Sequence, residues 1–377
     1  MSIARVENRA PDRYALHHVQ LLHPETAQPI ATIAKIDVGV ALGRWTANVH
    51  ATQIEKQHFP IAWKLLHNWF ICRPSASLHA ATFSFDEIRF AGVDHVTSLR
   101  DVVLKLLPDA QTLHLELKFQ LSDGTEHSSE LLAERPRSQL IIKRNHAPSH
   151  LSTELQLRTA TPLPCSLVTS LVPGVARLGE AATFAGIVNL DVGESTWNMQ
   201  LINAHLRHVD FSSVSYGTSL GLDGIGEVAI EKANVYPNQI DYAALTVTLD
   251  NGGRIGSSLL QSVGHHLSVQ VRNSQPAHYH AFDKAAISFC IHPQSLQLAG
   301  RLPDGGLFSD GEGNLASRPV ELWPIAIPLH HVVDVLDTPA RLPNQTRSQL
   351  ARSALIWLPL EVAPERTASS LRLSRNE

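Results

Sequence analysis

The feature that most constrains the fold of this chain is a strict alternation of apolar and polar side chains. Its clearest stretch runs from 113 to 121, where Leu or Phe occupies every odd position and His, Glu, Lys or Gln every even one. Successive side chains of a β-strand point to opposite faces of the sheet, so this stretch has one dry face and one wet face. It predicts a half-buried antiparallel strand.

The same alternation recurs along the chain and predicts a series of strands. They are expected at 32–40, 83–90, 155–157, 197–201, 228–230, 245–249 and 287–291. Parallel strands need long crossover connections, and none is evident between successive strands. The chain is therefore predicted to be mainly β, an elongated or curved antiparallel β-meander with a few short amphipathic helices packed on the sheet or capping it.

Helical periodicity is confined to short segments. Residues 60–70 form an apolar stripe that opens at Pro60, residues 164–172 form a second stripe that ends at Pro173-Gly174, and residues 257–267 form a third that opens at a capping serine. Residues 99–107 fit a helix or a strand equally well. We expect the helices to lie across the sheet and bury its apolar face.

Length sets the expected organisation into domains. A chain of 377 residues is long enough for two or three units or for one elongated element. We expect an N-terminal β-rich domain over 1–155 and a C-terminal β-meander domain over 156–363. The second would end in a Pro-rich wrapping segment, and a loose polar tail would cover 364–377.

Composition argues against several classes of partner and site. The balance of 31 Lys and Arg against 35 Asp and Glu contains no basic block, so no nucleic acid partner is predicted. Cys72, Cys165 and Cys290 lie far apart without zinc spacing and are expected to be buried free thiols. The 21 histidines are interpreted as polar residues of exposed strand faces, with a pH sensor as the alternative. The doublets 17–18, 265–266 and 330–331 would point to opposite faces of strands.

The best candidate for a metal site is the segment 278–283. His278 and His280 would share one face of a strand, and Asp283 could complete a ligand set for a metal-dependent hydrolase. Surface histidines are the favoured interpretation, because neither the HxHxDH pattern of metallohydrolases nor an HExxH motif is present. No catalytic residue, metal or cofactor is predicted, and the chain is expected not to be an enzyme.

Two glycine-rich segments have functional alternatives that we do not favour. Residues 221–226 superficially resemble a phosphate loop, but they lead into an expected strand, and glycines that permit a bend are the preferred interpretation. Residues 304–312 carry alternating acidic oxygens without the order of an EF-hand. A solvated turn is therefore preferred to a calcium site.

The spacing of glycines and strands in the second half resembles that of AsmA-like proteins, a cell-envelope family with long C-terminal β-meanders. The segments that carry the resemblance are 184–190, 197–209, 222–233, 240–249 and Gly253-Arg254-Ile255, together with the turn 21–26 and the strand 30–40 in the first half. The resemblance implies an open curved sheet with an apolar inner face, acting in lipid transport between membranes or in outer-membrane assembly. It brings no catalytic residues.

The resemblance also implies a partner and a location. We expect lipid acyl chains or an envelope protein as the partner, on an apolar sheet face formed by Leu113, Leu115, Leu117, Phe119, Leu245, Val247 and Leu249. If these residues line an exposed groove they could hold acyl chains, and if helices cover them they are core. A periplasmic location follows from the resemblance. With no signal peptide or transmembrane segment evident, membrane association would need an upstream anchor, and a cytoplasmic location stays open.

The alternative hypothesis is a structural or adhesion module that binds protein or glycan. It predicts closed, helix-free β-sandwiches with loops clustered at their ends.

Overall fold

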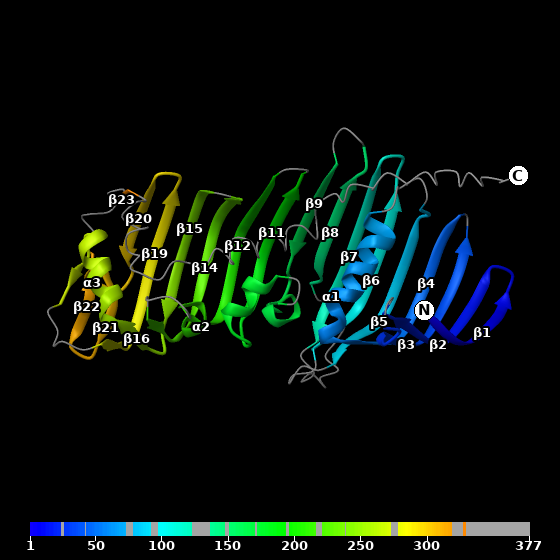
Figure 1. The fold of residues 1–377 in the computed structure, drawn as a ribbon, viewed down its shortest axis with the longest axis horizontal. Coiled ribbons are helices and arrows are strands. Elements are labelled where there is room, and N and C mark those ends of the chain that lie inside the picture. Colours follow the sequence, from blue (N-terminus) through cyan, green and yellow to red (C-terminus); the bar gives the residue numbers. More distant parts are fainter. Residues whose placement is uncertain are drawn as a thin grey trace, which may run out of the picture.

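The computed structural model describes residues 1–318 and 327–328, with gaps at 24–25, 42, 73–77, 92–96, 123–135, 148–150, 170–171, 194–195, 216–220, 238 and 273–277. Twenty strands of the described chain form one elongated sheet, along which the chain advances from one end to the other (Figure 1). The predicted mainly β, largely antiparallel meander with a few short helices is confirmed.

The first nine strands pair in chain order. They are β1 (Ser2–Ala10), β2 (Arg13–Leu22), β3 (Pro29–Ala41), β4 (Arg44–Glu55), β5 (Ala81–Ala91), β6 (Thr97–Pro108), β7 (Thr112–Ser122), β8 (Ser138–Asn145) and β9 (Ser152–Arg158). The ambiguous segment 99–107 is therefore a strand, within β6. Its continuous pairing with β5 and β7 decides a choice that periodicity left open.

The sheet continues without interruption into the second half of the chain. Strand β9 pairs with β8 on one side and with β11 on the other. The strands that follow are β11 (Thr183–Val192), β12 (Trp197–Asp210), β14 (Ile225–Tyr236), β15 (Gln239–Leu249), β19 (Lys284–His292) and β20 (Ser295–Gly300). The strands thus run unbroken across residue 155, and the division into domains stays a prediction.

The remaining strands are short. In the large sheet, β10 (Leu163–Pro164) pairs with β11, and β17 (Gln270–Val271), β21 (Gly306–Asp310), β22 (Gly313–Ser317) and β23 (Ile327–Pro328) lie at the far end. A separate small sheet contains β13 (Leu222–Asp223), β16 (Gly253–Gly256) and β18 (Tyr279–Phe282). The glycine-rich segment 221–226 thus enters strands, as predicted. Gly224 has a φ of +139°, and a Cβ there would lie 2.9 Å from the Gly252 carbonyl oxygen.

One parallel pair departs from the predicted meander. Strands β4 and β5 run in the same direction, from the pairing of Trp45 with Ala81 to that of Glu55 with Ala91. The chain must return across the sheet between them. It does so through the 3-10 turn η1 (Lys56–His58), helix α1 (Phe59–Leu66) and a π-helical turn η2 (His67–Ile71). The expectation of no crossover was wrong here, although the helix that forms the crossover was predicted.

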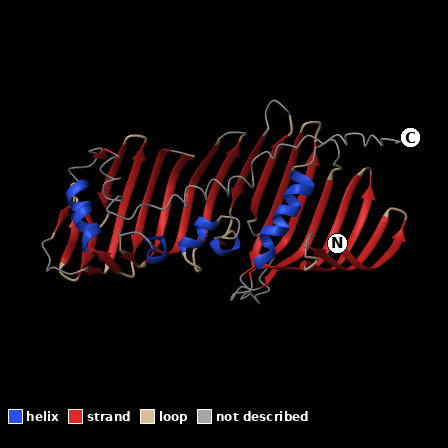
Figure 2. Cartoon of the chain, viewed as in Figure 1, coloured by secondary structure: helices blue, strands red, loops and turns tan. Residues whose placement is uncertain are grey.

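The other helices are short and lie on the same side of the sheet as α1 (Figure 2). They are α2 (Phe211–Ser215), α3 (Ser257–His266) and the 3-10 turns η4 (Cys165–Leu167), η5 (Pro173–Leu178) and η6 (Pro303–Gly305). Helix α3 confirms the third predicted helix, but Gly256 is its N-cap and no side chain caps it.

The helix predicted over 164–172 was wrong in its described part. Only the three-residue turn η4 forms, and Val168 follows it with non-helical backbone angles, φ −109° and ψ 0°. An apolar stripe of so few residues is too short to form a stable helix by itself. Pro173 begins the next 3-10 turn and does not end a helix.

Candidate functional site

The central feature of the sheet is a transverse row of in-register apolar side chains. Directly paired residues share a face, so their registers can be followed from strand to strand. Starting from β2, the row consists of Tyr14, Val38, Ala47, Phe83, Leu104, Leu117, Leu140, Leu157, Val188, Leu201, Ala233, Ala243, Ile291 and Leu296. One face of the sheet, called the apolar face below, is therefore apolar along this row across fourteen strands.

The opposite face is polar along an equivalent row. Beginning at β5, its paired residues are Thr82, Lys105, Glu116, Ile141, Gln156, Asn189, Gln200, Asn234 and Tyr242. Carboxylates on this face have basic partners. The Lys118 ammonium lies 2.8 Å from Glu116 and holds the pKa of that carboxyl below its usual value. The sheet is thus amphipathic along most of its length.

Helix α1 and the turn η2 cover the apolar face over β5, β6 and β7. Ile71 is fully buried in a cluster with Leu106, Leu113 and Leu115, and Trp63 packs against the same cluster. Two aromatic pairs fix the crossover to the sheet: the rings of Phe59 and Phe90 are 5.6 Å apart, and those of Phe70 and Phe83 are 6.3 Å apart. This part of the face is core.

Helix α3 covers the far end of the same face. Leu260 is buried with Leu249, Ile255 and Leu307, and Val263 packs against the cluster. Between the two helices, the central cluster of the described residues consists of Ala204, Ile230, Ala233 and Ala243, with larger side chains such as Leu201 and Leu245 only half-buried around it.

The apolar face is most exposed on the strands before the crossover. Val6 is 59% exposed on β1, Tyr14 is 42% exposed on β2 and Trp45 is 44% exposed on β4. Val6 lies in register with Leu16, which pairs in turn with Ile36. In the described part of the chain, this end of the sheet presents exposed apolar side chains of the kind that bind a partner or ligand, while Ala47 and Val49 on β4 are buried.

The seven residues predicted to form the apolar sheet face divide between these regions. Five belong to the helix-covered clusters: Leu113, Leu115 and Leu117 lie under α1, and Val247 and Leu249 lie with α3. Phe119 is buried, and Leu245 lies in the central cluster. The sequence reasoning missed the exposed surface on β1, β2 and β4. The alternation over 32–40 was the signal that could have found this surface, because the strand that contains it, β3, pairs with β2 and β4.

A group of buried polar side chains interrupts the apolar face beside η2. Arg144 on β8 is only 2% exposed and lies in register with Leu113 on one side and Thr153 on the other. Its guanidinium donates a 2.6 Å hydrogen bond to Thr153 Oγ1, but its Nε has no partner. The Nε2 of His146, two residues further on, is also buried without a partner. Sequence reasoning did not single out these residues.

The end of η2 adds two groups to this polar cluster. His67 is 3% exposed, and its Nδ1 lies 3.2 Å from the Cys72 sulfur. Burial lowers the pKa of His67, and the charge of Arg144 lowers it further. Burial also lowers the pKa of His146 and raises that of the Cys72 thiol. The interpretation of histidines as exposed filler is wrong for His67, because the crossover places it against the sheet.

Other histidines do lie among the charged groups of the polar face. His17 lies 3.2 Å from Glu7, and His50 lies 3.4 Å from both Asp37 and Asp86. The hydrogen bond from Lys35 holds the pKa of Asp37 below its usual value. In the doublet at 17–18, His18 lies within β2 with a φ of +51°, and the doublet at 265–266 is in helix α3. The third doublet lies outside the described residues.

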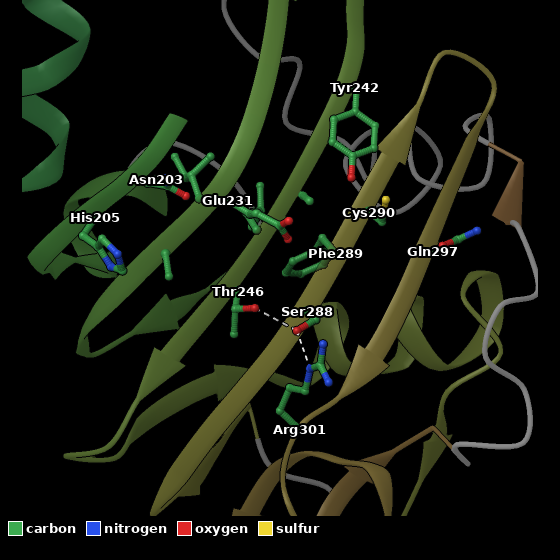
Figure 3. Close-up of a pocket in the computed structure, with 14 residues that line it drawn as sticks. Asn203, His205, Glu231, Tyr242, Thr246, Ser288, Phe289, Cys290, Gln297 and Arg301 are labelled. Carbon is green, nitrogen blue, oxygen red and sulfur yellow. Dashed lines mark hydrogen bonds between the residues drawn. The ribbon is translucent and has the colours of Figure 1, made fainter. Parts of the chain in front are cut away.

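A pocket of about 440 Å³ opens on the polar face of β12, β14, β15, β19 and β20 (Figure 3). The Thr246 and Ser288 hydroxyls lie 2.8 Å apart, and Arg301 Nε donates a 2.6 Å hydrogen bond to Ser288. The Tyr242 hydroxyl points toward Cys290 in Figure 3, and their hydrogen bond raises the pKa of Tyr242. The dashed bonds in Figure 3 cross-link neighbouring strands and so account for part of the polar lining.

The candidate metal ligands do not converge in the described structure. His278 and Asp283 are exposed at the two ends of β18, and His280 lies within it. Among the described residues no group of three His, Cys, Asp or Glu side chains is placed to hold an ion. In the acidic segment 304–312, Asp310 pairs with Arg272 and accepts a hydrogen bond from the Glu312 amide, so it forms part of a hairpin.

All three cysteines are free, as predicted. Only Cys165 is buried, and burial raises the pKa of its thiol to about 11. Cys72 and Cys290 are half-buried, and each lies beside a histidine, His67 and His292 respectively. The expectation of buried thiols was therefore wrong for these two residues.

Comparisons of the chain with protein-family models, with curated proteins and with solved structures found no match in any of the three. The AsmA-like resemblance is thus neither supported nor opposed by them. No helix among the described residues is long and apolar enough to cross a membrane. The closed, helix-free sandwich that the adhesion hypothesis predicts differs from the one large sheet with packed helices observed here.

Proposed function

We propose that this chain is a non-enzymatic lipid-handling protein of the cell envelope, of the AsmA-like type, and that it holds acyl chains against the apolar face of its sheet. The observation that carries the proposal is the in-register apolar row across fourteen strands. With strands about 4.8 Å apart, the row extends on the order of 60 Å, which is longer than one acyl chain.

The partial exposure of the apolar face distinguishes it from an ordinary core. A single sheet must bury its apolar face against another layer, and the described helices α1 and α3 cover only two parts of it. Val6, Tyr14 and Trp45 remain exposed at the end nearest the N-terminus. Apolar surface of this kind favours a lipid or an apolar partner because water leaves it on binding.

The proposal is tested by titrating the purified protein with a fluorescent fatty acid at micromolar concentration. We expect saturable binding. The double variant Val6→Ser, Trp45→Ser should weaken binding by about tenfold or more, since it removes two large exposed apolar contacts. The matched control is Arg5→Ser, which alters an exposed residue next to Val6 on the opposite face of β1.

Two results would contradict the proposal. One is the absence of binding to any acyl probe at micromolar concentration. The other is equal binding by the double variant, the control and the wild type, which would mean that the probe binds elsewhere. Circular dichroism of each variant establishes that the sheet is intact, so that a loss of binding is not a loss of fold.

A further inference from the structure

The polar cluster on the apolar face contains a cation without a counter-charge among the described residues. Arg144 is 2% exposed, and Thr153 Oγ1 accepts its one side-chain hydrogen bond in the described structure. No described carboxylate forms an ion pair with it, and burial lowers its pKa. A buried guanidinium costs several kcal/mol unless it is paired and hydrogen-bonded.

The groups around the Arg144 guanidinium could bind an anion that carries a hydrocarbon chain. Arg144 Nε, on β8, and His146 Nε2, just past the end of β8, are buried atoms without a partner, and both can donate a hydrogen bond. Leu113 and Val192 flank Arg144 and Thr153 in register, so apolar surface adjoins the charge on both sides. The cluster therefore combines an unsatisfied positive group with a lining for hydrocarbon.

The segment above the cluster is an irregular one. η2 is a π-helical turn, a rare form that is frequently found at functional sites. Helix α1, which precedes it, has no fully buried side chain. Displacing α1 would therefore expose less apolar surface than displacing a core helix, and η2, which buries His67 and Ile71, must move with it for a ligand to reach Arg144.

We propose that Arg144, with His146 beside it, binds the anionic headgroup of an acyl lipid whose chain lies along the apolar face. The inference rests on the proposed lipid-handling function and specifies its substrate class as acidic, single-chain or double-chain lipids. The headgroup supplies the acceptor oxygens that Arg144 Nε lacks, and Leu113 and Val192 contact the start of the chain.

The test compares three probes by titration calorimetry: lysophosphatidic acid with a palmitoyl chain, monopalmitoylglycerol with the same chain, and inorganic phosphate. The wild type is expected to bind lysophosphatidic acid at least about tenfold more tightly than the neutral lipid, the ratio for one hydrogen bond to a charged group. Arg144→Met should abolish that preference and leave binding of monopalmitoylglycerol unchanged. The matched control Lys143→Met removes an exposed charge from the opposite face of the same strand and should retain the preference.

Thermal unfolding of the lipid-free variants gives a second readout. Met has a similar length without the charge, so Arg144→Met should melt at or above the wild-type temperature if the guanidinium is unpaired in the folded protein. A structural role for Arg144 predicts the reverse. Should Arg144→Met fail to fold, Arg144→Lys keeps the charge without the planar Nε donor and is expected to weaken lysophosphatidic acid binding severalfold.

Several outcomes would overturn the inference. These are an unchanged preference in Arg144→Met or Arg144→Lys, an Arg144→Met protein that melts well below the wild type with its preference intact, and inorganic phosphate binding as tightly as lysophosphatidic acid. If monopalmitoylglycerol binds while Arg144→Met changes nothing, the lipid-handling function stands and only the headgroup site falls. If neither lipid binds, the proposed function itself fails.

Discussion

The strands before the crossover and the strands beneath it are built from the same pattern but differ in what covers them. Strands β2 to β4 and strands β5 to β7 each place apolar side chains at every second position over much of their length and pair them in register. On β7, Leu113 and Leu115 are 1% and 2% exposed, whereas on β1 and β2, Val6 and Tyr14 are 59% and 42% exposed.

The difference comes from one parallel pair of strands. Because β4 and β5 run in the same direction, the connecting α1 must cross the sheet, and it buries the strands over which it passes. Hairpins join β1 to β4 and contribute no helix to that part of the face, although α1 reaches it at β3. The same alternation thus forms core in one region and an apolar surface in the other.

The largest expected effect is at the covered region. Leu115→Ala should lower the free energy of unfolding by about 3 kcal/mol, because it leaves a cavity under Ile71. Val6→Ala on the exposed region should change it by less than about 0.5 kcal/mol. Urea unfolding of both variants measures the contrast, and similar losses would mean that the two regions are equally packed.

A pH dependence at about pH 6 is expected next, in the covered region. The folded-state pKa of His67 is lowered below its usual 6.5, so the unfolded chain binds a proton that the folded chain does not. Stability is therefore full above about pH 6.5 and falls as the pH decreases, by at most about 1.4 kcal/mol per pH unit for one proton.

The control for this pH dependence is His67→Leu, whose apolar side chain suits the same buried place. It should reduce the slope of stability against pH between about 6.5 and 5, with the remainder coming from groups such as His146. Hydrogen exchange of the α1 amides at about pH 6.5 and about pH 5 measures the same loss of stability locally, at the crossover. An unaltered slope in the variant would show that His67 titrates normally.

A smaller effect on stability is expected where the apolar face is exposed. Trp45→Ser should cost less than about 1 kcal/mol, since the indole is 44% exposed and gains only part of its burial energy. The fluorescence of Trp45 should nevertheless shift to shorter wavelength when an acyl lipid binds, relative to Trp45→Phe as the blank. No change in this difference spectrum would place the lipid away from β4.

The smallest effect is expected on the polar face. Lys143 and Glu154 lie 3.9 Å apart with side chains 58% and 62% exposed. Lys143→Met should change stability by less than about 0.5 kcal/mol, and less still in high salt. A larger loss by urea unfolding would mean that charges on this face contribute to holding β8 and β9 together.

The local sequence pattern predicted strands with regular alternation over nearly their full length. It predicted only part of the strands that contain bulges. The predicted strand 113–121 corresponds to β7, but β12 extends nine residues past the predicted end at 201. Asn203 and His208 have positive φ, and the register shifts between Leu206 and Val209. Each bulge shifts the order of inward and outward side chains by one position, so a strict period of two no longer detects the strand.

For the candidate site, the sequence by itself determined that one face of each strand is apolar, because side-chain alternation is a local property of extended backbone. It also determined the stripe of apolar side chains by which α1 packs on this face. Only the tertiary structure decided which parts of the face are covered. Coverage depends on the direction in which β5 pairs with β4, a long-range choice that alternation does not encode. The packing of the crossover on the sheet also buried Arg144 beside His67 on the apolar face. An arginine in a strand would otherwise be expected to be exposed.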